Sequence, residues 1–157
     1  EVFRQTEQDR LLGNAMAAYL KAEKLRYANP PDPKEADKIY CQILSIAKRH
    51  LGHRHPMTLL HMANMCGLYK LHNVEKLHPM MQAILEALRE MPGTRSLPFV
   101  IYSLTEYGDI LKRSDISEAI AMYREALQFA RERPKENAGH IETLEQRIKE
   151  ARVKEKK

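Results

Sequence analysis

The sequence has no tryptophan and contains only 6 glycines, 3 phenylalanines and 2 cysteines among its 157 residues. It also lacks the runs of valine, isoleucine and threonine that are typical of strands, which argues against an all-β fold. The scarcity of glycine excludes a collagen-like chain, and a hydrophobic content of 43% argues against disorder. The length is close to the usual size of one compact domain, so we expect a single helical domain over residues 1–157.

Long apolar runs are also missing. The longest, Ala15 to Leu20, is far too short to cross a bilayer. Cys41 and Cys66 stand apart from any metal-ligand spacing and lie within apolar helical patterns, so we predict two reduced core thiols in an intracellular compartment rather than a disulfide or redox pair. The chain begins at Glu1 without a methionine, which we interpret as a processed or excised form. Cytoplasm and mitochondrion are not distinguished by these features.

The chain repeats itself with a period of about 42 residues. Asp32, Asn73 and Asp115 are separated by 41 and 42 residues. Five apolar positions follow in the same register, namely Ala36/Leu77/Ala119, Tyr40/Met81/Tyr123, Ile43/Ile84/Ala126, Leu44/Leu85/Leu127 and Ala47/Leu88/Ala130. Their spacing places them on one face of an α-helix in each copy. Three equivalent helices are therefore predicted.

Each predicted helix has a start signal. Asp32 and Asp115 precede Glu35 and Glu118 by three residues, the pattern of a helix N-terminus, whereas Asn73 is a weaker copy. Pro56 and Pro98 introduce further helical patterns, which we interpret as the first helices of the second and third pairs.

A last helix over about 137–154 carries one apolar stripe made by Ile141, Leu144, Ile148 and Ala151. Such a helix can close the open end of a stack of helical pairs. We therefore predict an all-α, right-handed α-solenoid of three helical hairpins and a C-terminal capping helix, about seven helices in all. The predicted repeats cover about 6–50, 56–91 and 97–133.

Two segments resemble the tetratricopeptide repeat: Leu12-Gly13-Asn14-Ala15, and the stretch from Glu118 to Leu127. The long period, and the segment from Leu51 to Thr58, are similar to the long-repeat variant of kinesin light chains. Leu77 departs from the family pattern because it replaces a small residue, and so does Pro79, which lies early in the second helix of its pair. The resemblance implies a protein-interaction module whose first helices, called A helices, line a concave face.

Taking Leu12, Met65 and Tyr107 as equivalent gives the side chains that would line that face. They are Glu7, Arg10, Asn14, Ala17, Leu60, Ala63, Gly67, Lys70, Tyr102, Thr105, Asp109 and Lys112. The predicted partner-binding residues are Arg10, Asn14, Asn64, Lys70, Tyr102, Asp109 and Lys112; the alternative is that they are only solvated. Some family members clamp the acidic C-terminus of heat-shock chaperones. Arg10, Asn14 and Asn64 match three of the five clamp positions, but Tyr102 and Glu106 occupy the other two, so we do not expect a clamp.

Residues 48–55, which we call the basic turn, contain no acidic residue. Lys48, Arg49, His53 and Arg54 form a predicted basic surface to which an acidic protein, a phosphate or RNA can dock. Aromatic residues are absent there, which makes nucleic acid the less favoured partner. His50, His53, His55 and His61 lack the carboxylate or cysteine companions of a metal site, so we predict no metal.

No glycine-rich phosphate loop, nucleophile elbow or paired ligand motif is present, so we predict neither catalysis nor a cofactor. We predict a protein-interaction scaffold that is a structural or assembly subunit of a hetero-complex. The alternative is a free adaptor that binds a partner peptide in its concave groove, and RNA binding is less favoured. The net charge of +5 favours acidic partners, but the sequence does not identify them.

Overall fold

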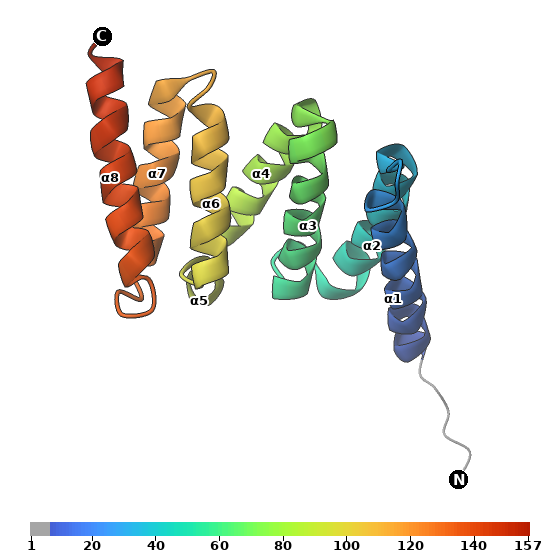
Figure 1. Ribbon diagram of the computed structural model, residues 1–157. Helices are drawn as coiled ribbons and strands as arrows, with labels where there is room; N and C mark the ends of the chain where they lie inside the picture. The colour runs from blue at the N-terminus through green and yellow to red at the C-terminus, as the bar shows by residue number, and fades with distance from the viewer. Residues whose placement is uncertain (1–6) are drawn as a thin grey trace. The chain divides into compact units, whose positions relative to one another are not determined.

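The computed structural model describes residues 7–157, apart from the side chains of residues 8, 9 and 12, and this range is α-helical without strands (Figure 1). The elements are α1 (Glu7–Arg26), α2 (Pro33–Leu51), α3 (Pro56–His72), α4 (Val74–Arg89), α5 (Pro92–Arg95), α6 (Pro98–Leu111), α7 (Ile116–Ala130) and α8 (Ala138–Glu155). The all-α prediction is confirmed. The seven expected helices are present, and the short helix α5 is additional.

The chain forms two compact units, which we describe separately. The first ends at Ala87 and the second comprises Leu88–Lys157. The division lies in the last turn of α4, inside the predicted second repeat rather than at its edge. The single-domain organisation stays a prediction.

The helix starts follow the sequence signals closely. An oxygen of Asp32 accepts a hydrogen bond from the amide of Glu35 at 3.2 Å. Asp115 accepts two such bonds, from Ser117 at 3.0 Å and Glu118 at 3.1 Å. These carboxylates satisfy amides that the first turn of a helix leaves unpaired. Proline occupies the first position of α2, α3 and α6, where its missing N–H is harmless and its fixed φ suits the helix.

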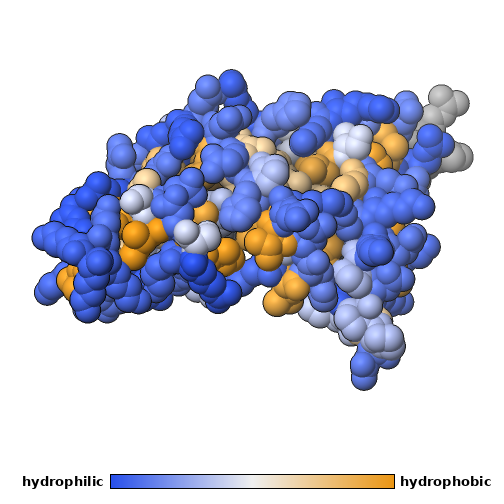
Figure 2. All heavy atoms as spheres, turned by 90° about the horizontal axis from the view of Figure 1, so that it is seen from above, coloured by the Kyte–Doolittle hydropathy of each residue, from blue (hydrophilic) through white to orange (hydrophobic). Residues whose placement is uncertain are grey.

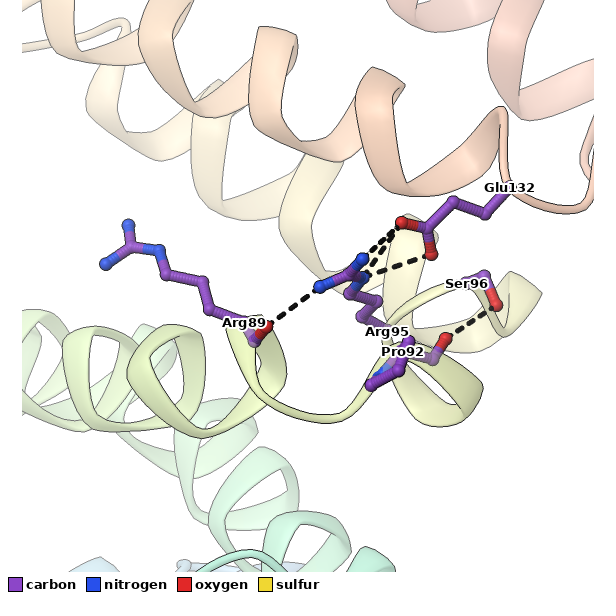
Figure 3. Close-up of polar contacts among 5 residues, drawn as sticks. All are labelled: Arg89, Pro92, Arg95, Ser96 and Glu132. Carbon is purple, nitrogen blue, oxygen red and sulfur yellow. Dashed lines mark hydrogen bonds and ion pairs between the residues drawn. The ribbon is translucent and has the colours of Figure 1, made fainter.

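The additional helix α5 begins at Pro92, ends before Pro98 and is one turn long. Its Arg95 reaches in two directions (Figure 3): Nη1 donates to the main-chain oxygen of Arg89 at 2.8 Å, and the guanidinium contacts the Glu132 carboxylate at 2.5–3.0 Å. Ser96 Oγ donates to the Pro92 oxygen at 3.2 Å. Hydrophobic periodicity cannot reveal so short a helix, because periodicity needs several turns.

In the first unit, α1 packs on α2 and α2 packs on α3. Small and branched side chains fill the contact, including Ala22, Ala36 and Ile43, none of them more than 2% exposed. Polar contacts between α1 and α3 join residues 38–41 positions apart. This separation is close to the sequence period, so α1 and α3 are related by about one period.

In the second unit, α6, α7 and α8 lie side by side (Figure 1). The predicted stripe of α8 is turned inward: Leu144, Ile148 and Ala151 are buried, and Ile141 is half-buried. Asn137, which precedes α8, is also buried and donates to the main-chain oxygens of Ser96 and Ala130 at 2.8 and 3.2 Å. Helix α8 therefore covers the apolar sides of α6 and α7, as expected of a capping helix.

The two cysteines differ, and the prediction was wrong for one of them. Cys66 is buried in α3, but Cys41 is exposed on α2. Its neighbours Tyr40 and Ile43 occupy the core face of α2, which leaves Cys41 on the outer side. No helix within residues 7–157 combines the length and the apolar character that a membrane span requires.

Candidate functional site

The first half of α1 carries the predicted groove residues Arg10 and Asn14, both exposed. The structure places the contact with α2 in the second half of the helix. There the rings of Tyr19 and Tyr40 lie 6.1 Å apart, and the Tyr40 hydroxyl donates to Glu23. In the second unit the equivalent tyrosine, Tyr123, bonds to Asp109. Glu23, rather than Asn14, therefore corresponds to Asp109, and the predicted register of α1 is wrong by nine residues.

The glycines explain this error. With Leu12 taken as equivalent to Tyr107, Gly13 corresponds to Gly108, yet a Cβ atom added to Gly13 meets nothing within 4 Å. A Cβ added to Gly108 would lie 2.4 Å from the Tyr123 ring. The Leu12-Gly13 pair therefore resembles the Leu-Gly pair of the repeat but does not pack against α2. The small residue of α1 at that contact is Ala22, which is fully buried.

A polar cluster joins α1, α2 and α3 in the first unit; we call it the Glu23 cluster, formed by Glu23, Arg26, Tyr40 and Asn64. Arg26 Nη1 donates to the side-chain oxygen of Asn64 at 3.1 Å and to its main-chain oxygen at 3.2 Å. Asn64 Nδ2 donates to Glu23 at 3.4 Å. A side chain at Gly67 would collide with Arg26, because its Cβ would lie 2.6 Å from Nη2. The predicted groove residue Asn64 therefore serves internal packing.

The three residues that matched clamp positions do not come together. Asn64 contacts Glu23, which is nine residues beyond Asn14 along α1. At 1.5 Å per residue this separation corresponds to about 14 Å. Arg10 lies another turn away, so these side chains do not form one carboxylate-binding site.

In the second unit, the predicted groove residue Asp109 belongs to a comparable cluster, the Asp109 cluster, formed with Tyr123 and Arg147. Tyr123 donates to Asp109 at 2.5 Å, and Arg147 donates to both carboxylate oxygens at 2.9 and 3.3 Å. Burial by itself raises the pKa of Asp109, but the hydrogen bonds from Arg147 and Tyr123 outweigh it and lower the pKa overall. Asp109 thus holds α6, α7 and α8 together.

A third cluster was missed by the sequence analysis. In the Asp37 cluster, Asp37 of α2 accepts from Tyr69 of α3 at 2.5 Å and from Lys76 of α4 at 2.6 Å. Burial raises the pKa of Asp37, yet the hydrogen bonds from Lys76 and Tyr69 lower it overall. All three clusters contain an acidic residue on one helix and a tyrosine on a neighbouring helix. This pairing is the sequence signal that could have predicted the Asp37 cluster.

The other predicted residues of α6 have separate surroundings. Tyr102 is 54% exposed and its hydroxyl donates to Glu106 at 3.3 Å. Thr105 was predicted to line the groove but is buried, and it donates to the Ile101 oxygen at 2.8 Å. Its position on the helix turns it toward the core, so this prediction was wrong. Lys112 is half-buried at the end of α6, and Lys70 is exposed near the end of α3.

Large apolar side chains are exposed mainly on α1, α3 and α6. In the first unit, Met16 and Leu20 on α1 and Met57, Leu60 and Leu71 on α3 form what we call the apolar face; Tyr27 follows α1, and Val74 begins α4. In the second unit, Phe99 and Tyr102 are exposed on α6 and Val153 on α8. Among the described residues, α2 and α7 expose none of this kind. Figure 2 shows orange apolar patches that interrupt a mostly hydrophilic surface.

The two helices of the apolar face are neighbours. The rings of Tyr19 on α1 and His61 on α3 lie 6.4 Å apart, and Arg26 reaches Asn64. Positions 57, 60 and 71 recur with helical spacing, so their side chains share one side of α3. Positions 16 and 20 likewise share one side of α1. Both helices are thus apolar on their buried side and partly apolar on their exposed side.

Hydrogen bonds from main-chain and side-chain groups hold the basic turn in one conformation. Gly52 has a φ of 87°, a value that favours glycine, and its amide donates to the Lys48 oxygen at 3.0 Å. The Thr58 hydroxyl donates to the Gly52 oxygen at 2.8 Å, and His55 Nδ1 accepts from the amide of Met57 at 3.1 Å. The predicted basic residues Arg49, His53 and Arg54 are exposed and Lys48 is half-buried, so the structure brings them together in one turn.

Reactive groups are not assembled within the described residues. No three histidine, cysteine or acidic side chains there are arranged to bind a metal ion. Burial raises the pKa of the Cys66 thiol to about 12. Cys41 is exposed, yet its partial burial and the nearby Asp37 raise its pKa as well. Both thiols are therefore poor nucleophiles at neutral pH, because the thiolate is the reactive form.

Comparisons with known proteins supply no family for the chain: no protein-family model matches it, and a search of curated proteins finds no significant match.

Proposed function

We propose that this chain is a non-catalytic protein-interaction scaffold, and that it is a structural or assembly subunit of a larger complex. The observation that carries the proposal is that most of the exposed large apolar side chains of the first unit lie on the neighbouring helices α1 and α3, while α2 exposes none. Scattered single apolar residues are normal on protein surfaces, but a group of them on adjacent helices favours an interaction site.

The proposal includes a helical-repeat architecture of three hairpins and a capping helix. Two kinds of polar contact support it. Within a predicted hairpin, Tyr40 bonds to Glu23 and Tyr123 to Asp109, over 17 and 14 residues. Between successive hairpins, or between a hairpin and α8, contacts span 38–41 residues. In a stack of helical repeats each repeat contacts only the repeats next to it, which leaves one side of the first helices available to a partner.

The free adaptor is the alternative, and the engaged polar groups weigh against it. A groove that selects a peptide needs polar side chains to fix the peptide's orientation. Asn64 and Asp109, which were predicted to do so, are tied to Arg26 and Arg147 within the fold. The remaining surface of the apolar face is more typical of a lasting, hydrophobic subunit contact.

The test replaces Leu20 and Leu60 together by lysine. Both side chains are about half exposed, so the fold tolerates the change, while a partner's apolar surface does not. We expect native size exclusion from cells to show the wild-type chain in a large complex and the variant near the monomer mass. Crosslinking mass spectrometry of the wild type should place neighbours on α1 and α3.

The matched control carries Gln42→Lys and Ser45→Lys, two exposed positions on α2. It adds the same charge to the opposite kind of surface and should leave elution unchanged. Circular dichroism and urea unfolding establish that all three proteins are equally folded. Elution of the wild-type chain at the monomer mass alone would contradict the proposal.

A further inference from the structure

The basic turn and the apolar face meet at one place on the first unit. Met57, 46% exposed, is part of the apolar face and follows the turn by two residues. The turn itself presents Lys48, Arg49, His53 and Arg54 and has no acidic residue. Cationic side chains and an exposed apolar side chain are therefore adjacent in the chain and in space. Met57 belongs to both surfaces, whereas the cationic residues of the turn take no part in the proposed function.

The turn is organised before any ligand binds. Its conformation is fixed by Gly52, by the hydrogen bond from Thr58 and by the cap that His55 provides to α3. A surface that is already ordered loses less conformational freedom on binding than a flexible one does. No ion pair is formed by Lys48 or Arg49 within the described residues, so these charges are not neutralised by the fold.

We propose that the basic turn, together with Met57, is a peripheral docking site for an anionic phospholipid membrane surface. Basic side chains near such a surface are attracted by its negative potential, and an adjacent apolar side chain can enter the boundary between headgroups and acyl chains. The site supplies both components within ten consecutive residues, 48–57. Single-stranded RNA fits less well, because the turn has no aromatic side chain on which a base can stack.

The start of α1 carries charges of both signs. Figure 1 shows the α2–α3 connection and the beginning of α1 at the same end of the unit. Glu7 and Arg10 are both exposed there. The basic turn, in contrast, carries charge of one sign only.

The experiment measures sedimentation of the purified full chain with phosphatidylcholine vesicles that contain phosphatidylserine. We expect binding to these vesicles, weaker binding as salt is raised, and little binding to phosphatidylcholine alone. Lys48→Gln with Arg49→Gln should weaken binding about thirtyfold, because each basic residue near an anionic surface contributes about fivefold. Met57→Gln should weaken binding at every salt concentration.

The control is Lys34→Gln with Lys38→Gln, exposed residues at the opposite end of α2 that remove the same charge. It should bind as the wild type does. Equal loss in the two double variants would overturn the site, since only net charge would then matter. Preference for polyuridylate over vesicles, with loss in the Lys48/Arg49 variant, would likewise overturn the lipid assignment in favour of RNA.

These outcomes are separable from the proposed function. Leu20 and Leu60 are outside the basic turn, so their lysine variant should lose the large complex without losing affinity for vesicles. A chain that assembles normally but never binds anionic vesicles contradicts the membrane site alone. A chain that binds vesicles but elutes as a monomer contradicts the subunit proposal alone.

Discussion

Tyr40 in the first unit and Tyr123 in the second occupy the same position of the sequence repeat, and both donate a hydrogen bond to a carboxylate on the preceding long helix. The carboxylates differ, Glu23 in α1 and Asp109 in α6. So does the residue before each, which is Ala22 in α1 and Gly108 in α6. At Gly108 the tyrosine ring lies directly against the main chain. Because the ring lies so close, the short side chain of Asp109 is long enough to accept the hydrogen bond from Tyr123. In α1, where Ala22 takes the place of the glycine, the acceptor is the longer side chain of Glu23.

The cation that accompanies each carboxylate also has a different origin. Arg26 follows Glu23 by three residues in the same helix, at 3.9 Å, and bonds mainly to Asn64. Arg147 comes from the capping helix α8 and contacts Asp109 at 2.9 Å. The comparison teaches that one tyrosine position can organise two different sets of supporting residues. In the second unit this arrangement also attaches the last helix.

The strongest way to break the comparison is Gly108→Ala. The new Cβ would overlap a tyrosine ring that is fully buried, and overpacking of this kind costs about 2 kcal/mol of unfolding free energy. Gly13→Ala is the matched control, since open space surrounds that position; it should gain about 1 kcal/mol from helix propensity. Urea unfolding measures both. Equal effects of the two substitutions would contradict the close packing at Gly108.

Replacing each tyrosine by phenylalanine tests whether the two clusters are energetically equivalent. Tyr40→Phe and Tyr123→Phe remove one hydrogen bond to a charged group, which is expected to cost about 1.5 kcal/mol in either unit. The phenyl ring keeps the packing, so the hydroxyl alone is measured. A neutral result for Tyr40→Phe would show that Arg26 and Asn64 satisfy Glu23 without it.

The helix caps give a smaller contrast between the units. Asp115 satisfies two amides of α7, and Asp32 satisfies one amide of α2. Asp115→Ala should cost about 1 kcal/mol, and Asp32→Ala should cost less. Urea unfolding of the two variants, measured in the same buffer, gives the order. The reverse order would show that the second hydrogen bond at Asp115 adds nothing.

The smallest expected effect is a dependence on pH. The pKa values of Asp37 and Asp109 are lower in the folded chain than in ordinary carboxyls, so ionised Asp37 and Asp109 stabilise the fold. That contribution is complete above the unfolded pKa of about 3.9 and is lost as pH falls through the folded values. Unfolding free energy measured from about pH 6 to about pH 3 should fall more steeply for wild type than for Asp37→Asn or Asp109→Asn. Identical slopes would contradict the prediction.

The sequence predicted the long helices because their signals are local. Proline at a first turn, aspartate caps and a 3.6-residue apolar period act within a few residues, and the structure has them where they were expected. The register of α1 could not be read in the same way. Leu12-Gly13 resembles a packing signal, but which glycine or alanine meets the tyrosine depends on the length of the turn that follows.

The candidate site was harder to predict than the fold. Asn64 and Asp109 lie on the expected helices, yet their side chains are bound by Arg26 and Arg147, which are 38 residues away in each case. Contacts of this range depend on packing between helices. The exposure of Leu60 and Tyr102 followed from helical spacing, because a position on the outer side of a helix needs no knowledge of distant residues.

Arg95 shows how one side chain completes the ends of two helices (Figure 3). Its guanidinium covers a main-chain oxygen in the last residue of α4 while it holds Glu132 beyond α7, and Phe129 lies 5.2 Å beneath it. These partners lie in different directions, and a planar group with five donors can meet them together. A lysine in this position has a single side-chain nitrogen. It would keep the positive charge but could not bond to the Arg89 oxygen and the Glu132 carboxylate in the same way.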